Sequence, residues 1–554
     1  MLGRTQEQVN ACSELQESSC EPHVRPSQVT PLTILFRSGP TIFWQGENLR
    51  ISVSVRNLLV ATCLAFSPLA TTAQRLSDPE ITDPVLFDAN RPLSNELHTS
   101  VLDGFTLAAV GDCIISRPLS HYAAREPKFA ESLNILKSAD ATYGNLETSL
   151  IDIRTFKGFP YTGVDDVPLL SEPGVAADLV TMGFKLMSRA NNHSLDWGLE
   201  GMRETTYWTS KAGLVTAGVG ETQGLARAAQ YFESSKGRIG IVSIASTYRA
   251  TSDALPERGA APGRPGLNAL SLKKTVVVPA NVMQELQKLA KDMYGPSSGP
   301  GKNTDQQGKL TLFDTKFESG PIRKMKYEIN DDEQSGILKA VRQGKQHSDF
   351  LLVTLHSHEP ADRTRSDPKT DFDDTPADFV HELAKAAIDS GADAFLTTGI
   401  HHLGPIEIYK GRPIFYGLGD FFWSDIQEPM PADFYAQYRE SIQAAFKKPE
   451  RATDADIAGA LNSQYFAGDL PFESVITQSR FEHGRLTMIR LYAVDLGYGM
   501  KLTESGIPRA ASAEKAQTIL NRMQRLSEPY GTRIDIEPEK DWHYVGVIRV
   551  NENL

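Results

Sequence analysis

From residue 105 onwards, the chain alternates short apolar runs with stretches of helical periodicity. Runs such as residues 106–110, 349–355 and 394–397 are typical of buried β-strands. Because helical stretches separate them, the pattern predicts βα units and a largely parallel sheet. The sequence therefore predicts an α/β fold with one large domain over residues 104–551.

The clearest helix is expected over residues 376–390. Thr375 is placed to cap it, and Pro376 suits its first turn. One stripe of apolar residues should face the sheet, and it comprises Phe379, Val380, Leu383, Ala384, Ala387 and Ile388. His381 points away from this stripe, which predicts a solvated surface residue.

Residues 251–347 interrupt this order. They contain Gly/Pro-rich stretches around one expected helix, residues 281–293. The pattern predicts a loop-rich insertion inside the domain.

Residues 472–550 return to β structure and are expected to close the domain. Two strands flank a turn in which Gly484 is free to adopt positive φ, which predicts a hairpin. A helix over residues 513–526, capped by Ser512, and two final strands follow.

An export signal is predicted over residues 51–73. Arg50 and Arg56 precede a short apolar run, and a small-x-small cleavage site follows it. The run is too short for a transmembrane helix, which needs about 20 apolar residues. The protein is therefore expected to be exported and to be periplasmic or extracellular after cleavage.

The residues on either side of this signal complete the N-terminal region. Residues 1–50 are either a leader created by an upstream start site or a disordered extension, and residues 74–103 are a polar linker. Cys113 is the only cysteine beyond residue 73, so no internal disulfide is expected after cleavage. We interpret it as a small buried hydrophobe.

The net charge of -12 and the lack of a long basic run argue against nucleic acid as a partner. An acidic protein can still bind an anionic polymer through a local basic groove. Candidates in the insertion are Arg264, Arg323, Lys324 and Lys326, with Arg264 as the expected substrate-binding residue. Ordinary surface charge is the alternative interpretation of each.

Polar residues follow six of the predicted strands in succession. Ligands of open α/β sheets bind at the carboxyl ends of the strands, so these residues are expected to converge. The polar groups are Asp112; Glu147; Asn191, Asn192, His193 and Asp196; His356, His358 and Glu359; His401 and His402; and Asp420. The run of residues 238–245 has no such group and shows that the pattern is not universal.

Carboxylate, amide and imidazole groups at one edge suit a divalent metal ion with mixed oxygen and nitrogen ligands. Zn, Mn, Fe and Ca are all admissible, and the lack of usable thiolates argues against a site based on cysteine. Such an ion could activate water or polarise an oxyanion, with a neighbouring histidine as general acid.

As an ordered set, the motifs resemble the CapA family, which is associated with bacterial capsule and poly-γ-glutamate synthesis. The motifs are GD at 111–112, GNLET at 144–148, ANNHSLDWG at 190–198, LHSHE at 355–359 and PIEIYKGRPIFYGLGDFF at 405–422. The resemblance spans about residues 105–423. It implies a fold like that of the calcineurin-like metallophosphoesterases, an αββα sandwich of two sheets flanked by helices.

The resemblance also implies roles for individual residues. It implies metal ligands at Asp112, Glu147, Asn192, His356 and His401, with His193 as proton donor and Asp196 as the acid that orients it. Further candidates are Asn191, His358, Glu359, His402 and Asp420.

The chain departs from the family at residues 397–401. Thr398 replaces the first histidine of a Gly-His-x-Pro-His pattern, and Ile400 replaces its proline. Asp420 stands where the family often has asparagine, and His402 is an alternative ligand for the position lost at Thr398. This departure bears on both the metal count and catalysis.

Three functions are compatible with these features. The first is an exported metal-dependent hydrolase that acts on a polymer or phosphoester. The second is a non-catalytic accessory protein for synthesis or export of an anionic polymer, and the third is a metal-dependent epimerase. Capsule-synthesis machinery at the membrane is a further expected partner.

Overall fold

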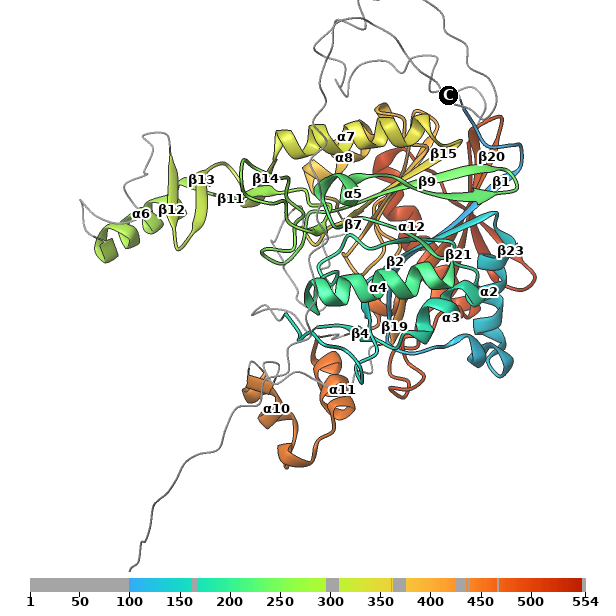
Figure 1. Ribbon diagram of the computed structural model, residues 1–554, viewed down its shortest axis with the longest axis horizontal. Helices are drawn as coiled ribbons and strands as arrows, with labels where there is room; N and C mark the ends of the chain where they lie inside the picture. Colours follow the sequence, from blue (N-terminus) through green and yellow to red (C-terminus); the bar gives the residue numbers. More distant parts are fainter. Residues whose placement is uncertain are drawn as a thin grey trace, which may run out of the picture. The chain divides into compact units, whose positions relative to one another are not determined.

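The computed structural model describes residues 99–161, 168–294, 308–359, 361, 375–424, 435–436, 438–465 and 468–550. All of them lie in one unit, Phe87–Leu554, which has a mixed α/β architecture (Figure 1). The predicted leader, the predicted signal peptide and residues 74–98 of the predicted linker lie outside the described residues. Among the described helices, none combines the length and apolar character that a membrane crossing requires.

The larger sheet has ten strands and is built around β1 (Phe105–Ile115). Its order is β23 (Asp535–Glu539), β24 (His543–Arg549), β21 (Arg485–Asp495), β20 (Glu473–Glu482), β1, β2 (Ala141–Leu146), β5 (Leu186–Ser188) and β6 (Val215–Ala217). In addition, β19 (Asp420–Ser424) pairs with β1, and β22 (Arg509–Ala510) pairs with β21.

The second sheet has six strands. Its order is β17 (Ile406–Tyr409), β18 (Arg412–Phe415), β16 (Ala394–Thr398), β15 (Phe350–His356), β9 (Gly237–Ala245) and β8 (Gln230–Ser234). Its four inner strands are parallel and its two edge strands are antiparallel.

The prediction of a mixed helix and strand fold is confirmed, but the prediction of a largely parallel sheet is only half right. In the larger sheet β19, β1, β2, β5 and β6 are parallel, whereas β20 to β24 form an antiparallel half. The antiparallel half includes the hairpin predicted around Gly484, whose φ is 69°.

The two sheets face each other across an apolar core. Phe105 of β1, Phe350 of β15 and Phe481 of β20 meet in this core, with ring centroids 5.2, 6.0 and 4.9 Å apart. The helix α12 (Ala513–Ser527) adds the predicted residues Ala516, Ile519, Leu520 and Met523 to the same core. Its cap is also as predicted, because the Ser512 side chain accepts a hydrogen bond from the Lys515 N–H.

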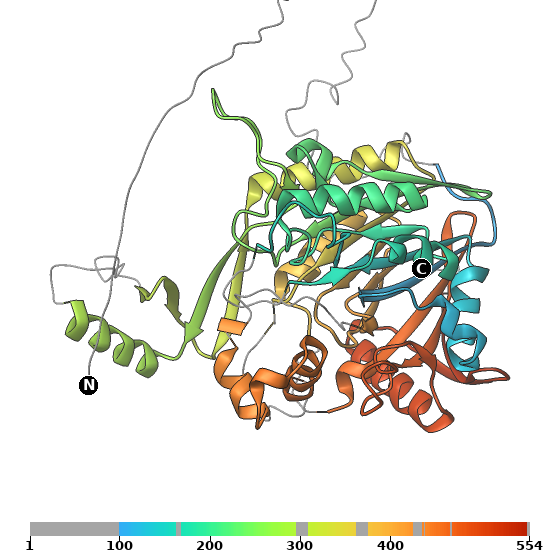
Figure 2. The ribbon, with the colours of Figure 1, turned by 60° about the horizontal axis from the view of Figure 1, so that its bottom comes forward.

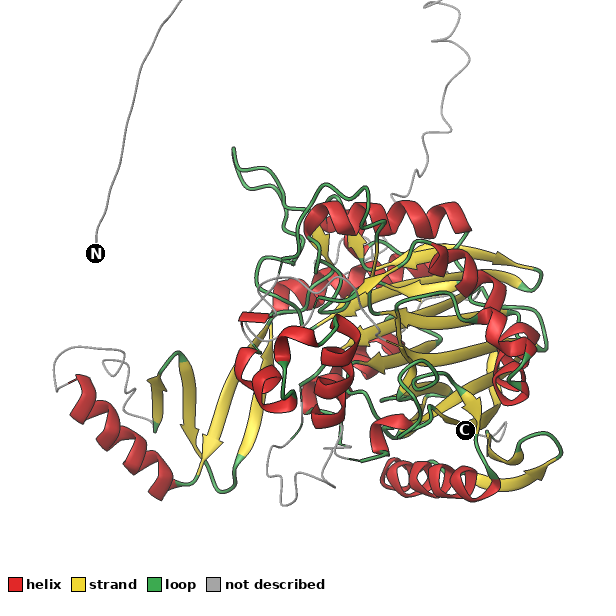
Figure 3. Ribbon diagram, turned by 90° about the horizontal axis from the view of Figure 1, so that it is seen from below, coloured by secondary structure: helices red, strands yellow, loops and turns green. Residues whose placement is uncertain are grey.

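Helices cover the outer faces of the two sheets (Figures 1 and 3). The helices α2 (Pro127–Ser138) and α3 (Gly174–Met182) pack on the larger sheet. On the second sheet lie α7 (Asp331–Gln346) and α8 (Asp378–Asp389). Other helices among the described residues are α4 (Gly198–Ala212), α5 (Gln223–Arg227), α10 (Arg439–Ala445) and α11 (Asp454–Tyr465).

Residues 251–347 are more ordered than the sequence suggests. They contain a four-stranded sheet with the order β12 (Lys309–Leu312), β13 (Thr315–Ser319), β11 (Leu272–Val278) and β14 (Lys324–Ile329). The helix α6 (Ala280–Tyr294) packs on β12 and β13 and has its own small core (Figure 2). The described part of the insertion is therefore less loop-rich than predicted, although residues 251–265 contain no helix or named strand, and α7 belongs to the main body because it packs on β9 and β15.

The helix predicted over residues 376–390 is α8, and its whole predicted apolar stripe is buried. Two details were wrong. Its N-cap is Ala377 without a side-chain cap, not Thr375. His381 is half-buried rather than solvated, because its Nε2 lies 3.0 Å from Oε2 of Glu407 and its ring lies 6.0 Å from that of Tyr416.

Asp112 lies within β1, not after it, at the point where the strand changes partners. One edge of β1 pairs with β20 over Phe105–Ala109 and with β19 from Asp112 onwards, where the register shifts. At Gly111 a Cβ atom would lie 1.8 Å from the carbonyl oxygen of Gly419. Only glycine therefore permits the close approach that places Asp420 beside Asp112. Asp420 follows β18 across a short connection, as predicted, and it is also the first residue of β19.

Replacing Gly111 by alanine tests this close approach. We expect the free energy of unfolding to fall by about 3 kcal/mol or more, because the new methyl group meets rigid backbone. Gly224→Ala in α5 is the matched control, since its Cβ would meet only Oγ1 of Thr222 at 3.9 Å. That variant should be neutral or slightly stabilised. Equal stability of the two variants in urea denaturation would contradict the proposed constraint.

Candidate metal centre

Asp112 joins the ends of both sheets. Its Oδ1 accepts a hydrogen bond from Nδ2 of Asn145 on β2, at 2.8 Å. Its Oδ2 accepts the backbone N–H of Gly399, directly after β16 of the second sheet, also at 2.8 Å. The side chain is buried, so a charged group lies between the sheets where their polar strand ends meet.

Asn145 is a site residue that the sequence interpretation missed. Its Nδ2 lies 3.2 Å from Nδ1 of His356, and its Oδ1 accepts Nδ2 of Asn191 at 3.2 Å. Asn191 also donates to the carbonyl of Leu146 at 2.9 Å and accepts the N–H of His193 at 3.1 Å. The amide of Asn191 therefore supports neighbouring residues instead of facing the cluster. The signal for Asn145 was its place two residues before Glu147, at the end of β2.

Three electron-rich groups surround Nε2 of His356. Its Nε2 lies 2.8 Å from Oδ1 of Asn192, 2.9 Å from Nε2 of His358 and 3.5 Å from Oε1 of Glu147. One ring N–H can satisfy only one of these acceptors. A cation shared by them would satisfy them together, so the arrangement fits a metal ion.

The protonation of His356 favours the same interpretation. Burial, followed by the charges of His358, His401 and His193, holds the pKa of His356 well below its usual value. The ring is therefore neutral near pH 7, and a neutral imidazole is the form that binds metals.

His401 and Asp420 form the other side of the cluster. Nδ1 of His401 lies 2.8 Å from Oδ1 of Asp420 and 3.6 Å from Oδ2 of Asp112. Burial raises the pKa of Asp420 to about 6, and its Oδ2 has no hydrogen-bond partner among the described residues. His401 has a φ of 56°, which is uncommon outside glycine and typical of functional sites.

Thr398, at the position where the resemblance implies a histidine, lies inside the site. Its Oγ1 is 3.1 Å from Nδ1 of His356, and its side chain is buried. It therefore supports the back of the His356 ring in place of offering a ligand. His402, the alternative ligand, is buried with Nδ1 3.3 Å from the carbonyl oxygen of Leu403.

The described residues contain two groups whose ligand atoms all lie within 4.8 Å of one another. One comprises Glu147, His356 and His358, and the other comprises Asp112, Glu147 and His401. Glu147 belongs to both groups and is completely buried. Two adjacent positions that share one carboxylate would suit one or two divalent ions.

His193 lies at the border of this cluster. Its Nδ1 is 2.7 Å from Oδ2 of Asp196, and its Nε2 is 4.0 Å from Oε1 of Glu147. Asp196 is completely buried and also accepts the N–H of Leu169 at 2.6 Å. The structure thus brings His193 and Asp196 together in the arrangement expected for an oriented imidazole.

Glu359 lies beside the cluster but outside both groups. It accepts hydrogen bonds from Oγ of Ser246, Oγ1 of Thr247 and Oγ of Ser357 at 2.7 to 2.8 Å, and its Oε1 is 2.9 Å from Nζ of Lys274 on β11. Thr247 also accepts the N–H of His358 at 2.8 Å. Glu359 thus ties the insertion to the segment that carries His358. Burial, the largest single influence, would raise its pKa, but the charge and hydrogen bond of Lys274 together with the hydrogen bonds of Ser246 and Thr247 lower it.

The predicted basic groove is largely neutralised by acidic partners. Arg264 pairs with Asp253. Lys326 lies 3.4 Å from Glu318, and Lys324 lies 3.9 Å from Asp378. Arg323 is exposed. None of these four residues belongs to the two groups of ligand atoms.

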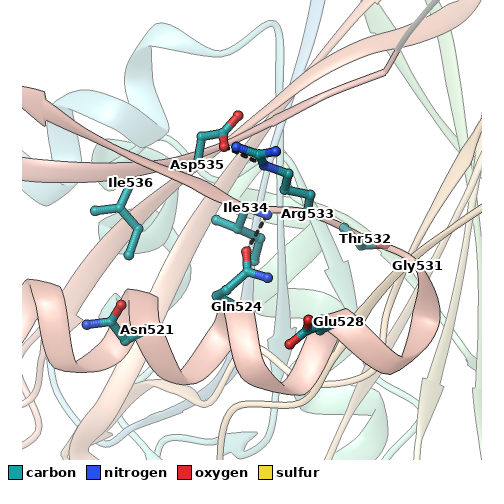
Figure 4. Close-up of a pocket in the computed structure, with 9 residues that line it drawn as sticks. All are labelled: Asn521, Gln524, Glu528, Gly531, Thr532, Arg533, Ile534, Asp535 and Ile536. Carbon is teal, nitrogen blue, oxygen red and sulfur yellow. Dashed lines mark hydrogen bonds and ion pairs between the residues drawn. The ribbon is translucent and has the colours of Figure 1, made fainter.

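A separate open hollow of about 620 Å³ lies between α12 and β23 (Figure 4). Its polar groups bond to one another: Arg533 pairs with Asp535 at 2.8 Å, and Oε1 of Gln524 accepts the N–H of Ile534 at 2.6 Å. The hollow has no histidine in its lining. It offers no comparable convergence of ligand atoms.

Comparison with known proteins agrees with this geometry. A family model described as "Bacterial capsule synthesis protein PGA_cap" matches residues 106–424. The chain belongs to this family. The matched range contains every residue of the two groups of ligand atoms, and the predicted resemblance to CapA is confirmed.

Individual relatives extend the similarity. The uncharacterized protein y4sH of Sinorhizobium fredii is 40% identical over 473 residues, which cover 84% of this chain and 97% of the relative. The PGA biosynthesis protein CapA of Bacillus subtilis is 23% identical over 324 residues, 58% of this chain and 63% of the relative. The "Probable polyglutamine synthesis accessory protein Rv0574c" of Mycobacterium tuberculosis is 25% identical over 234 residues, 42% of this chain and 43% of the relative.

The substitution Glu359→Gln tests whether the contact between Glu359 and Lys274 of the insertion stabilises the site. The variant keeps the shape of the side chain but removes the charge that faces Lys274. We expect the free energy of unfolding at pH 7 to fall by about 2–4 kcal/mol. Lys274→Met should also destabilise the fold, by about 1–3 kcal/mol, because it removes the counter-charge of the buried Glu359 carboxylate although Lys274 itself is 53% exposed.

The pH dependence provides a second check on Glu359. The pKa of Glu359 is lower in the folded protein than its value of 4.5 in the unfolded chain. The ionised Glu359 carboxylate therefore stabilises the fold fully above pH 4.5, and this stabilisation is lost as the pH falls through the lower pKa of the folded state. Urea denaturation should therefore show the wild type and Glu359→Gln converging in stability as the pH falls below 4.5. A difference that stays constant down to about pH 3 would contradict this assignment.

Proposed function

We propose that this chain is a metal-dependent hydrolase that acts on an anionic polymer or its phosphoester- or amide-linked units during capsule or poly-γ-glutamate synthesis. The observation that carries the proposal is the pair of ligand groups that share Glu147. The relatives from Bacillus subtilis and Mycobacterium tuberculosis, named for PGA biosynthesis and polyglutamine synthesis, support the polymer class.

The layer order supports a fold of the calcineurin-like metallophosphoesterase type. Two facing sheets carry helices on their outer faces, and the ligand groups lie at strand ends of both sheets. Fold alone does not set the reaction, so the argument for hydrolysis rests on the residues of the site.

These residues have separable tasks in the proposed reaction. A divalent ion bound by Asp112, Glu147, Asn192, His356 and His401, with His358 and Asp420 beside them, would polarise a phosphoryl or carbonyl oxygen and acidify water. Asp196 accepts a hydrogen bond from Nδ1 of His193 and so directs Nε2 towards the cluster. From Nε2, His193 would donate a proton to the leaving group.

A non-catalytic accessory role is the second candidate, and Thr398 favours it. A hydroxyl that supports His356 stands where the family has a histidine ligand. The accessory protein would bind the anionic polymer, and capsule-synthesis machinery at the membrane is its proposed partner. Export of the protein, through the signal predicted over residues 51–73, is part of both proposals.

A measurement of bound metal tests the premise that both candidate functions share, which is that the protein has a metal site. Purified wild type should hold at least about one equivalent of a divalent metal by elemental analysis, and Asp112→Ala/His356→Ala should hold none. The matched control is Asp103→Ala/His483→Ala, which removes an exposed pair 3.1 Å apart. This control should keep its metal. Equal and negligible metal in the wild type and the site variant would refute a metal site.

His193→Gln separates the two candidate functions. With bis(p-nitrophenyl) phosphate as probe, the hydrolase predicts a loss of turnover of about 100-fold or more with the metal content unchanged. His381→Gln on α8 is the matched control and should retain activity. Poly-γ-glutamate binding that survives loss of His193 and His356, without turnover in the wild type, would favour the accessory role.

A further inference from the structure

The loop after β9, residues 246–251, touches both sides of the candidate site although its strand carries no polar cluster. Oγ1 of Thr247 accepts a hydrogen bond from the N–H of His358 and donates one to the carboxylate of Glu359. Arg249, two residues later, reaches the other side at Asp196. This short segment therefore contacts both the residues around His358 and Asp196, the partner of His193.

Arg249 forms a buried bridge. Its side chain is 8% exposed, and its Nη2 lies 3.1 Å from Oδ1 of Asp196. Its Nη1 donates to the carbonyl oxygen of Tyr161 at 2.5 Å. The other oxygen of Asp196 receives Nδ1 of His193 at 2.7 Å. The carboxylate thus lies between the guanidinium, which contacts it as an ion pair, and the imidazole.

The loop holds a strained conformation at this place. Thr251 has a φ of 71°, which a β-branched residue rarely adopts. Its Oγ1 lies 3.1 Å from the hydroxyl of Tyr161, and the N–H of Tyr161 donates to the carbonyl oxygen of Asp196 at 2.5 Å. Strain of this kind persists only where the surrounding contacts hold it, and it clusters at functional sites.

We propose that Arg249 is a positioning residue for His193 and acts through Asp196. Its planar fork can hold the Asp196 carboxylate and the Tyr161 carbonyl in one fixed geometry. A fixed carboxylate fixes the ring of His193, with Nε2 towards Glu147. This inference rests on the proposed function only for the proton transfer, since the orientation of the ring is independent of metal and substrate.

The test compares Arg249→Met and Arg249→Lys with Arg203→Met. The matched control removes an arginine–carboxylate pair of 2.8 Å with Glu221, in which the arginine side chain is 50% exposed. Histidine side-chain 1H–15N spectra of the full chain are recorded in chelator, and His193→Gln identifies the signals of His193. The wild type should show a hydrogen-bonded Nδ1–H for His193.

This Nδ1–H signal should disappear in Arg249→Met and persist in Arg203→Met. Arg249→Lys keeps the charge, so it should keep the fold even if Arg249→Met does not. Its single ammonium cannot hold both partners in the same geometry, and the His193 signal should shift or broaden. An unchanged His193 signal in a folded Arg249 variant would overturn the proposal.

Kinetics of the metal-loaded protein provide the second readout. With bis(p-nitrophenyl) phosphate, kcat of Arg249→Lys should fall about 10- to 100-fold while KM and bound metal stay unchanged. A fall in kcat that merely follows a loss of bound metal would contradict a role through His193. If the wild type shows neither metal nor turnover, the proposed function fails, and the spectra still decide whether Arg249 positions His193.

Discussion

One buried carboxylate joins the two sheets of this protein. Asp112 accepts hydrogen bonds from Asn145 in its own sheet and from the backbone of Gly399 at the end of the other. A buried charge costs several kcal/mol unless it is paired and hydrogen-bonded. Asp112 is therefore stable only where strand ends of both sheets meet. Gly111 makes this meeting possible, because its missing side chain lets the backbone of Gly419 approach β1.

The remaining site follows from that junction. The apolar contact of Phe105, Phe350 and Phe481 aligns β1 with β15, and the carboxyl ends of the two strands carry Asp112 and His356. Burial then excludes water from a group of carboxylates and imidazoles, which strengthens their affinity for a cation. Supporting contacts come from Thr398, from Glu359 with Lys274, and from Arg249 with Asp196.

The sequence was informative where one residue type had one physical role. Polar residues after buried strands predicted the convergence of Asp112, Glu147, Asn192, His356 and His401, because parallel strands end at the same edge. The apolar stripe of α8 and the cap of α12 were also predicted correctly, because each residue type there has one physical role.

The sequence was less informative where the role of a residue depends on partners far along the chain. The run of residues 238–245 carries no polar cluster at its end, yet the loop after it supplies Thr247 and Arg249, whose partners lie far along the chain. The sheet of the insertion was missed because β11 and β14 carry exposed lysines that pair with acids, as Lys273 does with Glu328. His381 was misjudged because Glu407 cannot be placed from local periodicity.

The family match covers residues 106–424 and so contains both groups of ligand atoms. The most direct test of the central claim is a crystal structure with anomalous scattering measured at the absorption edge of the bound metal. We expect one or two peaks within bonding distance of Glu147, flanked by Asp112 and His401 or by His356 and His358. A metal-loaded crystal with no peak at Glu147, or with its only peak elsewhere, would contradict it.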